Sequence, residues 1–168
     1  MLIHVCPLSK VEATVARAGA QGLVSLLSAD TEITRPAAIA AENHLLLVMS
    51  DIAEMREGMT MPGEGHVRRL LAFTRSWERA KPLVVHCYAG VSRSPASAYI
   101  MAAALAPERS EVELARTLRF QSPTATPNSR LIAVADALLG RNGRMVAAIK
   151  AIGRGADAFE GTPFELEV

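Results

Sequence analysis

Short apolar runs mark the first half of the chain and predict strands. Runs rich in leucine and β-branched residues lie at Leu2–Val5, Gly22–Leu27, His44–Met49 and Leu83–Val85. They do not alternate regularly between apolar and polar residues, which is typical of strands that are buried on both faces, as in a parallel sheet.

Segments with helical spacing separate these runs. One extends from Ser9 to Ala18, and a second, amphipathic one extends from His66 to Ala80. The stretch Met55–Gly65 contains glycine and proline without a clear period and predicts an exposed loop. Strands that alternate with helices favour an α/β domain whose central, mostly parallel sheet is flanked by helices.

The second half of the chain predicts three helices and a tail. Residues 94–106 are apolar nearly all round, so this helix should be buried. A capping box at Ser110–Glu113 begins the next helix, and a third runs from Asn128 or Ser129 to about Gly140. We expect residues 1–152 to form a single domain and residues 153–168, which lack a period, to be a loosely ordered tail.

Composition and charge narrow the range of partners. Half of the 168 residues are apolar, which is enough for one well-filled core without disulfides. The formal net charge of +1 gives no strong field for nucleic acid or an anionic membrane, so neither is an expected partner. We expect a monomer without a cofactor.

The N-terminus and the cysteines favour a reducing compartment. The first ten residues have no basic region before the apolar stretch and do not fit a signal peptide. No apolar run approaches the length of a membrane span. The two cysteines, Cys6 and Cys87, lie far apart in the sequence and do not indicate a set of structural disulfides. We therefore expect a cytoplasmic protein.

The segment from Val84 to Ser94 combines a strand end, a short loop and a helix start. Backbone N–H groups and a helix N-terminus would converge there on one point, which is a ready site for an anion. Gly90 allows the loop to curl tightly. We therefore expect the phosphate of a substrate to be held by the loop and the arginine that follows it, namely Tyr88, Ala89, Gly90, Val91, Ser92 and Arg93.

Cys87 and Arg93 supply the chemistry of this loop. Amide groups, the helix dipole and a guanidinium group all favour a thiolate over a thiol, and a thiolate beside an oxyanion cradle is a nucleophile. Arg93 can hold two phosphate oxygens with its planar fork. Because the loop and Arg93 can stabilise the transferring group, we expect no metal ion to be required.

This run resembles the signature of the protein tyrosine phosphatase superfamily, in which His-Cys is followed by five residues, Arg, and Ser or Thr. The glycine three residues after the cysteine also matches. The resemblance covers about Leu45–Leu139 and implies a phosphocysteine intermediate. It also implies that Ser94 hydrogen-bonds the cysteine sulfur and helps it leave, and that His86 shapes the loop from behind.

The dual-specificity branch of this superfamily takes its general acid from an aspartate that follows a neighbouring strand, a few tens of residues before the cysteine. Asp51 has that position, and Glu54 and Glu57 on the same loop are its rivals. The pair Pro127-Asn128 resembles an element that begins the last large helix in many members. Asparagine is a common N-cap, so we expect Asn128 to act mainly in support of the structure.

The substrate stays open within phosphomonoesters. The loop contains no lysine, which disfavours phosphoinositides, and no upstream insertion would deepen the cleft for phosphotyrosine alone, so a dual-specificity-like site on a phosphorylated protein is expected. Alternatives are an inositol phosphate, another small-molecule substrate or an RNA 5′ end, a phosphate-binding module without turnover, and a rhodanese-like sulfur carrier. Cys6 is either a buried strand residue or a redox partner of Cys87.

Overall fold

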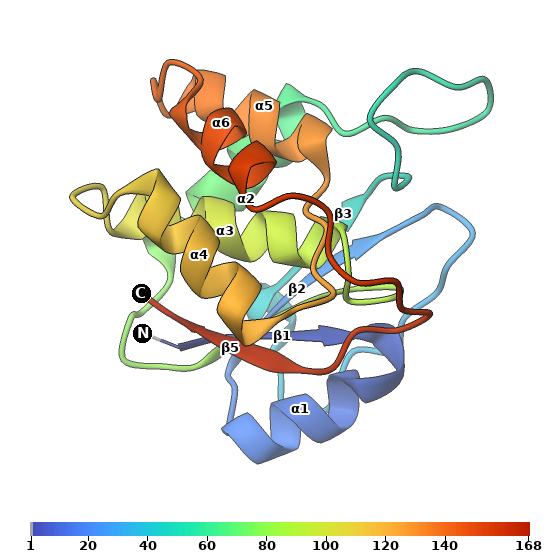
Figure 1. The fold of residues 1–168 in the computed structure, drawn as a ribbon. Helices are drawn as coiled ribbons and strands as arrows, with labels where there is room; N and C mark the ends of the chain where they lie inside the picture. Colours follow the sequence, from blue (N-terminus) through green and yellow to red (C-terminus); the bar gives the residue numbers. More distant parts are fainter. Residues whose placement is uncertain (1) are drawn as a thin grey trace.

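A five-stranded sheet forms the centre of the computed structural model, which describes residues 2–168 (Figure 1). The strand order is β3-β2-β4-β1-β5. The bounds are β1 Leu2–Pro7, β2 Gly22–Leu27, β3 His44–Val48, β4 Leu83–Cys87 and β5 Phe164–Glu167. The first four strands are parallel, and β5 alone runs antiparallel to β1. The expected mostly parallel sheet is confirmed.

Helices cover the sheet unequally (Figure 1). One face is covered by α1 (Val11–Ala18), which packs on β1 and β4. The helices α2 to α6 lie on the other face, with α3 against the strands and α5 and α6 further out. Their bounds are α2 Glu64–Ser76, α3 Arg93–Leu105, α4 Glu111–Gln121, α5 Ser129–Leu138 and α6 Arg144–Ala151.

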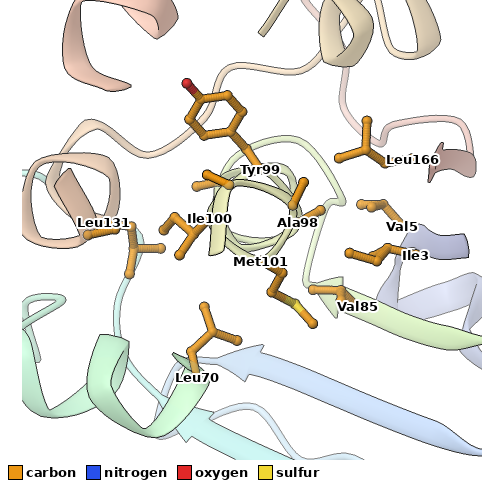
Figure 2. Close-up of a cluster of buried hydrophobic side chains, with 14 of the residues drawn as sticks. Ile3, Val5, Leu70, Val85, Ala98, Tyr99, Ile100, Met101, Leu131 and Leu166 are labelled. Carbon is orange, nitrogen blue, oxygen red and sulfur yellow. The ribbon is translucent and has the colours of Figure 1, made fainter. Parts of the chain in front are cut away.

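The helix α3 lies at the centre of the larger core. All but one of its residues are buried, so the apolar run predicted from the sequence is confirmed as a buried helix. Figure 2 shows Leu70 of α2, Leu131 of α5 and Leu166 of β5 around it. Each side chain of this size stabilises the fold by about 1.5–3 kcal/mol when it is fully buried. The packing therefore fixes the start of α3, where Arg93 and Ser94 lie.

The C-terminal residues contradict the expectation of a loosely ordered tail. Residues 164–167 form β5, whose Leu166 is fully buried and whose register runs from Leu2 opposite Glu167 to Val5 opposite Phe164. The preceding residues are also held, since the N–H of Ala156 donates to the carbonyl of Pro123 at 3.0 Å. A four-residue strand has too short a pattern to be recognised, and its partner β1 lies at the other end of the chain.

Two helices differ from the sequence-based expectation. The helix α2 ends at Ser76 and not at Ala80. The next residue, Trp77, has an extended backbone conformation, and its ring stacks on that of Phe73. The helix α6 was not predicted. Its start is capped by the carboxylate of Asp136, which accepts hydrogen bonds from the N–H groups of Gly143 and Met145 at 2.6 and 2.8 Å. That cap comes from α5, so local sequence does not reveal it.

Candidate active site at the carboxyl edge of the sheet

The loop between β4 and α3 lies at the carboxyl edge of the sheet, where open α/β sheets bind their ligands. It begins after Cys87, the last residue of β4, and ends at Arg93, the first residue of α3. Gly90 at its centre has φ +71°, and a Cβ there would lie 2.7 Å from the backbone nitrogen of Pro7. The loop therefore requires glycine at this position both for its conformation and for its approach to β1.

The carbonyl groups of the loop point outward. Those of Tyr88 and Ala89 accept from the N–H groups of Leu8 at 3.0 Å and Gly161 at 2.8 Å. Those of Val91 and Ser92 accept from Thr126 at 2.8 Å and Asn128 at 3.3 Å.

Because a trans peptide is planar and none of the peptides in this loop is cis, the N–H that follows each of these four carbonyls points the opposite way, into the loop. The four groups belong to Ala89, Gly90, Ser92 and Arg93. Within residues 2–168 the N–H groups of 88–92 donate to no acceptor. Such converging, unpaired donors form a nest for an anion.

Cys87 and Arg93 lie at the two ends of this nest and are both buried. Cys87 is 2% exposed, and the hydroxyl of Ser94 donates to its sulfur at 3.2 Å. Arg93 is 5% exposed and donates through Nη1 to the carbonyl of Met49 at 2.8 Å and the hydroxyl of Ser28 at 3.3 Å.

The guanidinium group of Arg93 is not neutralised by any carboxylate among residues 2–168, and its buried Nε has no hydrogen-bond partner there. A buried cation of this kind is costly unless an anion pairs with it. The arrangement can therefore bind a phosphate-like anion next to the sulfur of Cys87.

Asp51 is brought to the same loop. Its Oδ1 accepts hydrogen bonds from the hydroxyl of Ser92 at 2.7 Å and from Nδ2 of Asn128 at 2.8 Å. Its rivals Glu54 and Glu57 make no hydrogen bond or ion pair with the rest of the described chain and lie exposed. The geometry thus favours Asp51 as the carboxyl group that faces a ligand in the loop.

Asn128 has two functions in the structure. Its Oδ1 caps α5 by accepting from the N–H groups of Arg130 at 3.1 Å and Leu131 at 3.0 Å. Its Nδ2 holds Asp51, which lies on a different segment. The expected N-cap is present, and the second contact places Asn128 within the site as well.

Solved structures similar to this chain share one fold. Human DUSP28 superimposes with a TM-score of 0.62 and 20% sequence identity, over 83% of this chain and 94% of its own. The Yvh1 phosphatase domain from Chaetomium thermophilum gives 0.62 and 16%, over 85% and 93%. Human tyrosine phosphatase-like serine/threonine/tyrosine-interacting protein gives 0.64 and 13%, over 83% and 92%. No family model and no curated protein matches the sequence.

The chain has the fold of the dual-specificity phosphatases. This confirms the expected architecture, with the loop placed between a strand and a buried helix. One of the similar proteins is described only as a phosphatase-like interacting protein, and all three identities are low. The chemistry of the chain must therefore be argued from its own site residues.

Behind the loop, His86 takes part in a buried chain of hydrogen bonds. Its Nδ1 lies 3.3 Å from the carbonyl of Cys87, and its Nε2 lies 2.6 Å from the hydroxyl of Ser25, which is 2.9 Å from Nε2 of His44. Burial lowers the pKa of His86 to about 4, so the ring is neutral at pH 7.

The neutral ring determines the direction of these bonds. A carbonyl can only accept, so the proton of His86 is on Nδ1, its Nε2 accepts from Ser25, and Ser25 accepts from Nε2 of His44. Burial, followed by the charge of Arg35, also lowers the pKa of His44. Ser25 and His44 were not among the predicted site residues, because only strand pairing brings Ser25 to His86 and His44 to Ser25.

Cys6 lies on the other face of the sheet from Cys87. Cys6 lies opposite His86 in the pairing of β1 with β4, and it packs with Val84 in the smaller apolar cluster beneath α1. Cys87 belongs to the larger core on the other face. Neighbouring residues along a strand point to opposite faces, so a bond between the two sulfurs requires the backbone to move. Both cysteines are free, and burial raises the pKa of Cys6 to about 12. The geometry favours the buried strand residue over the redox partner.

No group of three or more His, Cys, Asp or Glu side chains in 2–168 is arranged to hold a metal ion. No helix in the same range is long and apolar enough to cross a membrane.

Proposed function

We propose that this chain is a cysteine-dependent phosphatase that hydrolyses phosphomonoesters of proteins through a phosphocysteine intermediate. The observation that carries the proposal is the buried Arg93, which has no carboxylate partner and lies at the end of a nest of unpaired N–H groups beside Cys87. A phosphate dianion supplies the missing negative charge and the missing hydrogen-bond acceptors at once.

The first step transfers the phosphoryl group to the enzyme. The thiolate of Cys87 attacks phosphorus, a sulfur–phosphorus bond forms, and the bond from phosphorus to the ester oxygen breaks. Arg93 and the inward N–H groups hold the equatorial oxygens through this change. The leaving oxygen takes a proton from Asp51, whose Oδ2 is free of other hydrogen bonds within residues 2–168.

The second step hydrolyses the phosphocysteine. Water attacks phosphorus while the carboxylate of Asp51 takes its proton, and the sulfur–phosphorus bond breaks to release inorganic phosphate. The hydroxyl of Ser94, which donates to the sulfur at 3.2 Å, stabilises the departing thiolate. Each proton that Asp51 gives in the first step is thus returned in the second.

A phosphorylated protein is the substrate that the site favours. Asp51 and Tyr88 at the rim of the loop are exposed, which leaves the site open to a large ligand. An inositol phosphate or another small metabolite would use the same chemistry, but Tyr88–Ser92 contributes no cationic side chain for additional phosphates. A binding module without turnover would need neither Cys87 nor an acid held at the loop.

The experiment that tests the proposal is steady-state hydrolysis of a generic aryl phosphate by the purified protein, with and without excess chelator. We expect turnover that persists in chelator, since the loop and Arg93 provide the stabilisation that a metal provides in other phosphatases. A panel of phosphopeptides and inositol phosphates then ranks the substrate classes. Phosphate release that occurs only with an added divalent ion would contradict the mechanism.

A further inference from the structure

A small recess opens on the β1 side of the loop between β4 and α3, residues 88–92, which is called the phosphate loop below. It has a volume of about 200 Å³ and is lined by Leu8, Ser9, Tyr88, Phe159 and Glu160. Phe159 and Tyr88 are 92% and 57% exposed, and Phe120 on α4 is the one other exposed aromatic residue within 2–168. Two of these three residues therefore meet at one recess, and a cluster of exposed aromatic side chains is typical of a binding site.

The walls of the recess are fixed relative to Cys87. Tyr88 directly follows Cys87, and its carbonyl accepts from the N–H of Leu8 at 3.0 Å. The segment with Phe159 is tied on by Gly161, whose N–H donates to Ala89 at 2.8 Å. A Cβ at Gly161 would lie 3.0 Å from the carbonyl oxygen of Gly90, so the segment lies directly against the loop. The recess is thus formed before any substrate arrives.

The charge at the recess is negative. Glu160 lies on its wall, where Oε2 accepts from the hydroxyl of Ser9 at 2.6 Å. A second recess of about 310 Å³ shares Leu8 and Ser9 and adds the carboxylates of Glu12 and Glu32. No lysine or arginine lines either recess. Aromatic faces next to carboxylates attract a guanidinium or ammonium group.

We propose that the recess between Tyr88, Phe159 and Glu160 binds an arginine or lysine side chain of the phosphorylated protein substrate, close in sequence to its phosphorylated residue. The inference rests on the proposed function, because the phosphate loop positions the substrate. An extended peptide advances about 3.3 Å per residue, so a basic side chain one to three residues away reaches a recess that begins at Tyr88. The chain would therefore select phosphosites with basic neighbours.

The test compares pairs of phosphopeptides that differ only in having arginine or glutamate beside the phosphorylated residue. Pairs built on phosphotyrosine and phosphothreonine cover both substrate types. We expect kcat/KM of the wild type to be about tenfold higher for the arginine peptide, and Phe159→Ala and Glu160→Gln each to reduce this preference about threefold. Phe120→Ala, an equally exposed phenylalanine on α4, is the matched control and should keep the wild-type ratio.

Failure of this inference can be told apart from failure of the proposed function. A wild type without preference, or an unchanged ratio in both recess variants, overturns the inference while leaving aryl phosphate hydrolysis intact. Calorimetric binding of the same peptides to Cys87→Ser measures the preference without turnover. If the wild type hydrolyses no phosphomonoester, the proposed function is wrong, and equal binding of the two peptides then overturns the recess as well.

Discussion

The phosphate loop and the C-terminal segment lie side by side but are built in different ways. The loop is defined by residues close together in sequence, from Cys87 at the end of β4 to Ser94 in α3. The C-terminal segment, residues 153–167, is held by contacts to distant parts of the chain, such as Gly161 to Ala89 and β5 to β1. In the proposed mechanism the loop carries out the reaction, whereas the segment adds the antiparallel edge strand β5 to the sheet and places Phe159 and Glu160 beside the loop.

Because the two regions are built differently, changes in them should have different consequences. In the proposed mechanism a side chain in the loop region contacts the reacting group, so its replacement should act on the rate and leave the fold intact. A buried side chain in β5 contacts only the core, so its replacement should act on stability.

Asp51→Asn should lower kcat by about two to four orders of magnitude for an alkyl phosphate, because the leaving oxygen then departs without a proton. The loss should shrink for an aryl phosphate with an acidic leaving group. The pH profile should also lose its alkaline limb. If the limb survives in Asp51→Asn and instead disappears in Glu54→Gln or Glu57→Gln, the acid has been misassigned.

Arg93→Lys should lower kcat/KM by about two to three orders of magnitude, the range for the loss of one preorganised donor at the transition state. A lysine keeps the charge but cannot hold two oxygens with a planar fork. Steady-state kinetics together with thermal unfolding separate rate from stability. Near-normal kinetics in a folded variant would remove Arg93 from the transition state.

The positions of four residues at the candidate site could be predicted from the sequence. Cys87 could be assigned to a strand end, Gly90 to the loop and Arg93 to a helix start, because strand, loop and helix follow one another directly along the chain. Asp51 could be placed at the carboxyl edge because parallel strands end together there.

Contacts between distant segments could not be predicted. Ser25 reaches His86 only through the pairing of β2 with β4, and Asp136 caps α6 only after α5 and α6 have packed. The strand β5 was missed for the same reason, since four residues carry no decisive pattern and their partner lies at the other end of the chain. The recess at Phe159 depends on that missed region.

Leu166→Ala should lower the free energy of unfolding by about 2–5 kcal/mol, because it leaves a cavity in the core while the loop keeps its contacts. Activity per folded molecule should stay close to that of the wild type. Denaturant unfolding measures the change, and Glu167→Ala, an exposed site on the same strand, should change stability by less than about 0.5 kcal/mol. Equal losses in both variants would show that β5 does not anchor through its buried face.

The pH dependence of stability should depend on His86. Burial lowers its pKa from 6.5 to about 4, so between these values the unfolded chain binds more protons than the folded protein, and stability is lost as the pH falls. The loss due to this residue from pH 7 to pH 5 should be about 2 kcal/mol. In His86→Gln the fall in unfolding free energy between pH 7 and pH 5 should be smaller by that amount. An unchanged fall would mean that His86 is not held neutral in the fold.

The proposed covalent intermediate at Cys87 can be trapped and identified directly. The protein is mixed with an aryl phosphate, quenched in acid within one turnover and digested for mass spectrometry. We predict one phosphoryl group on the peptide that contains Cys87, and no phosphopeptide and no turnover in Cys87→Ser, which should still bind phosphate analogues. Sustained turnover by Cys87→Ser, or a phosphoryl group on another residue, would contradict the mechanism.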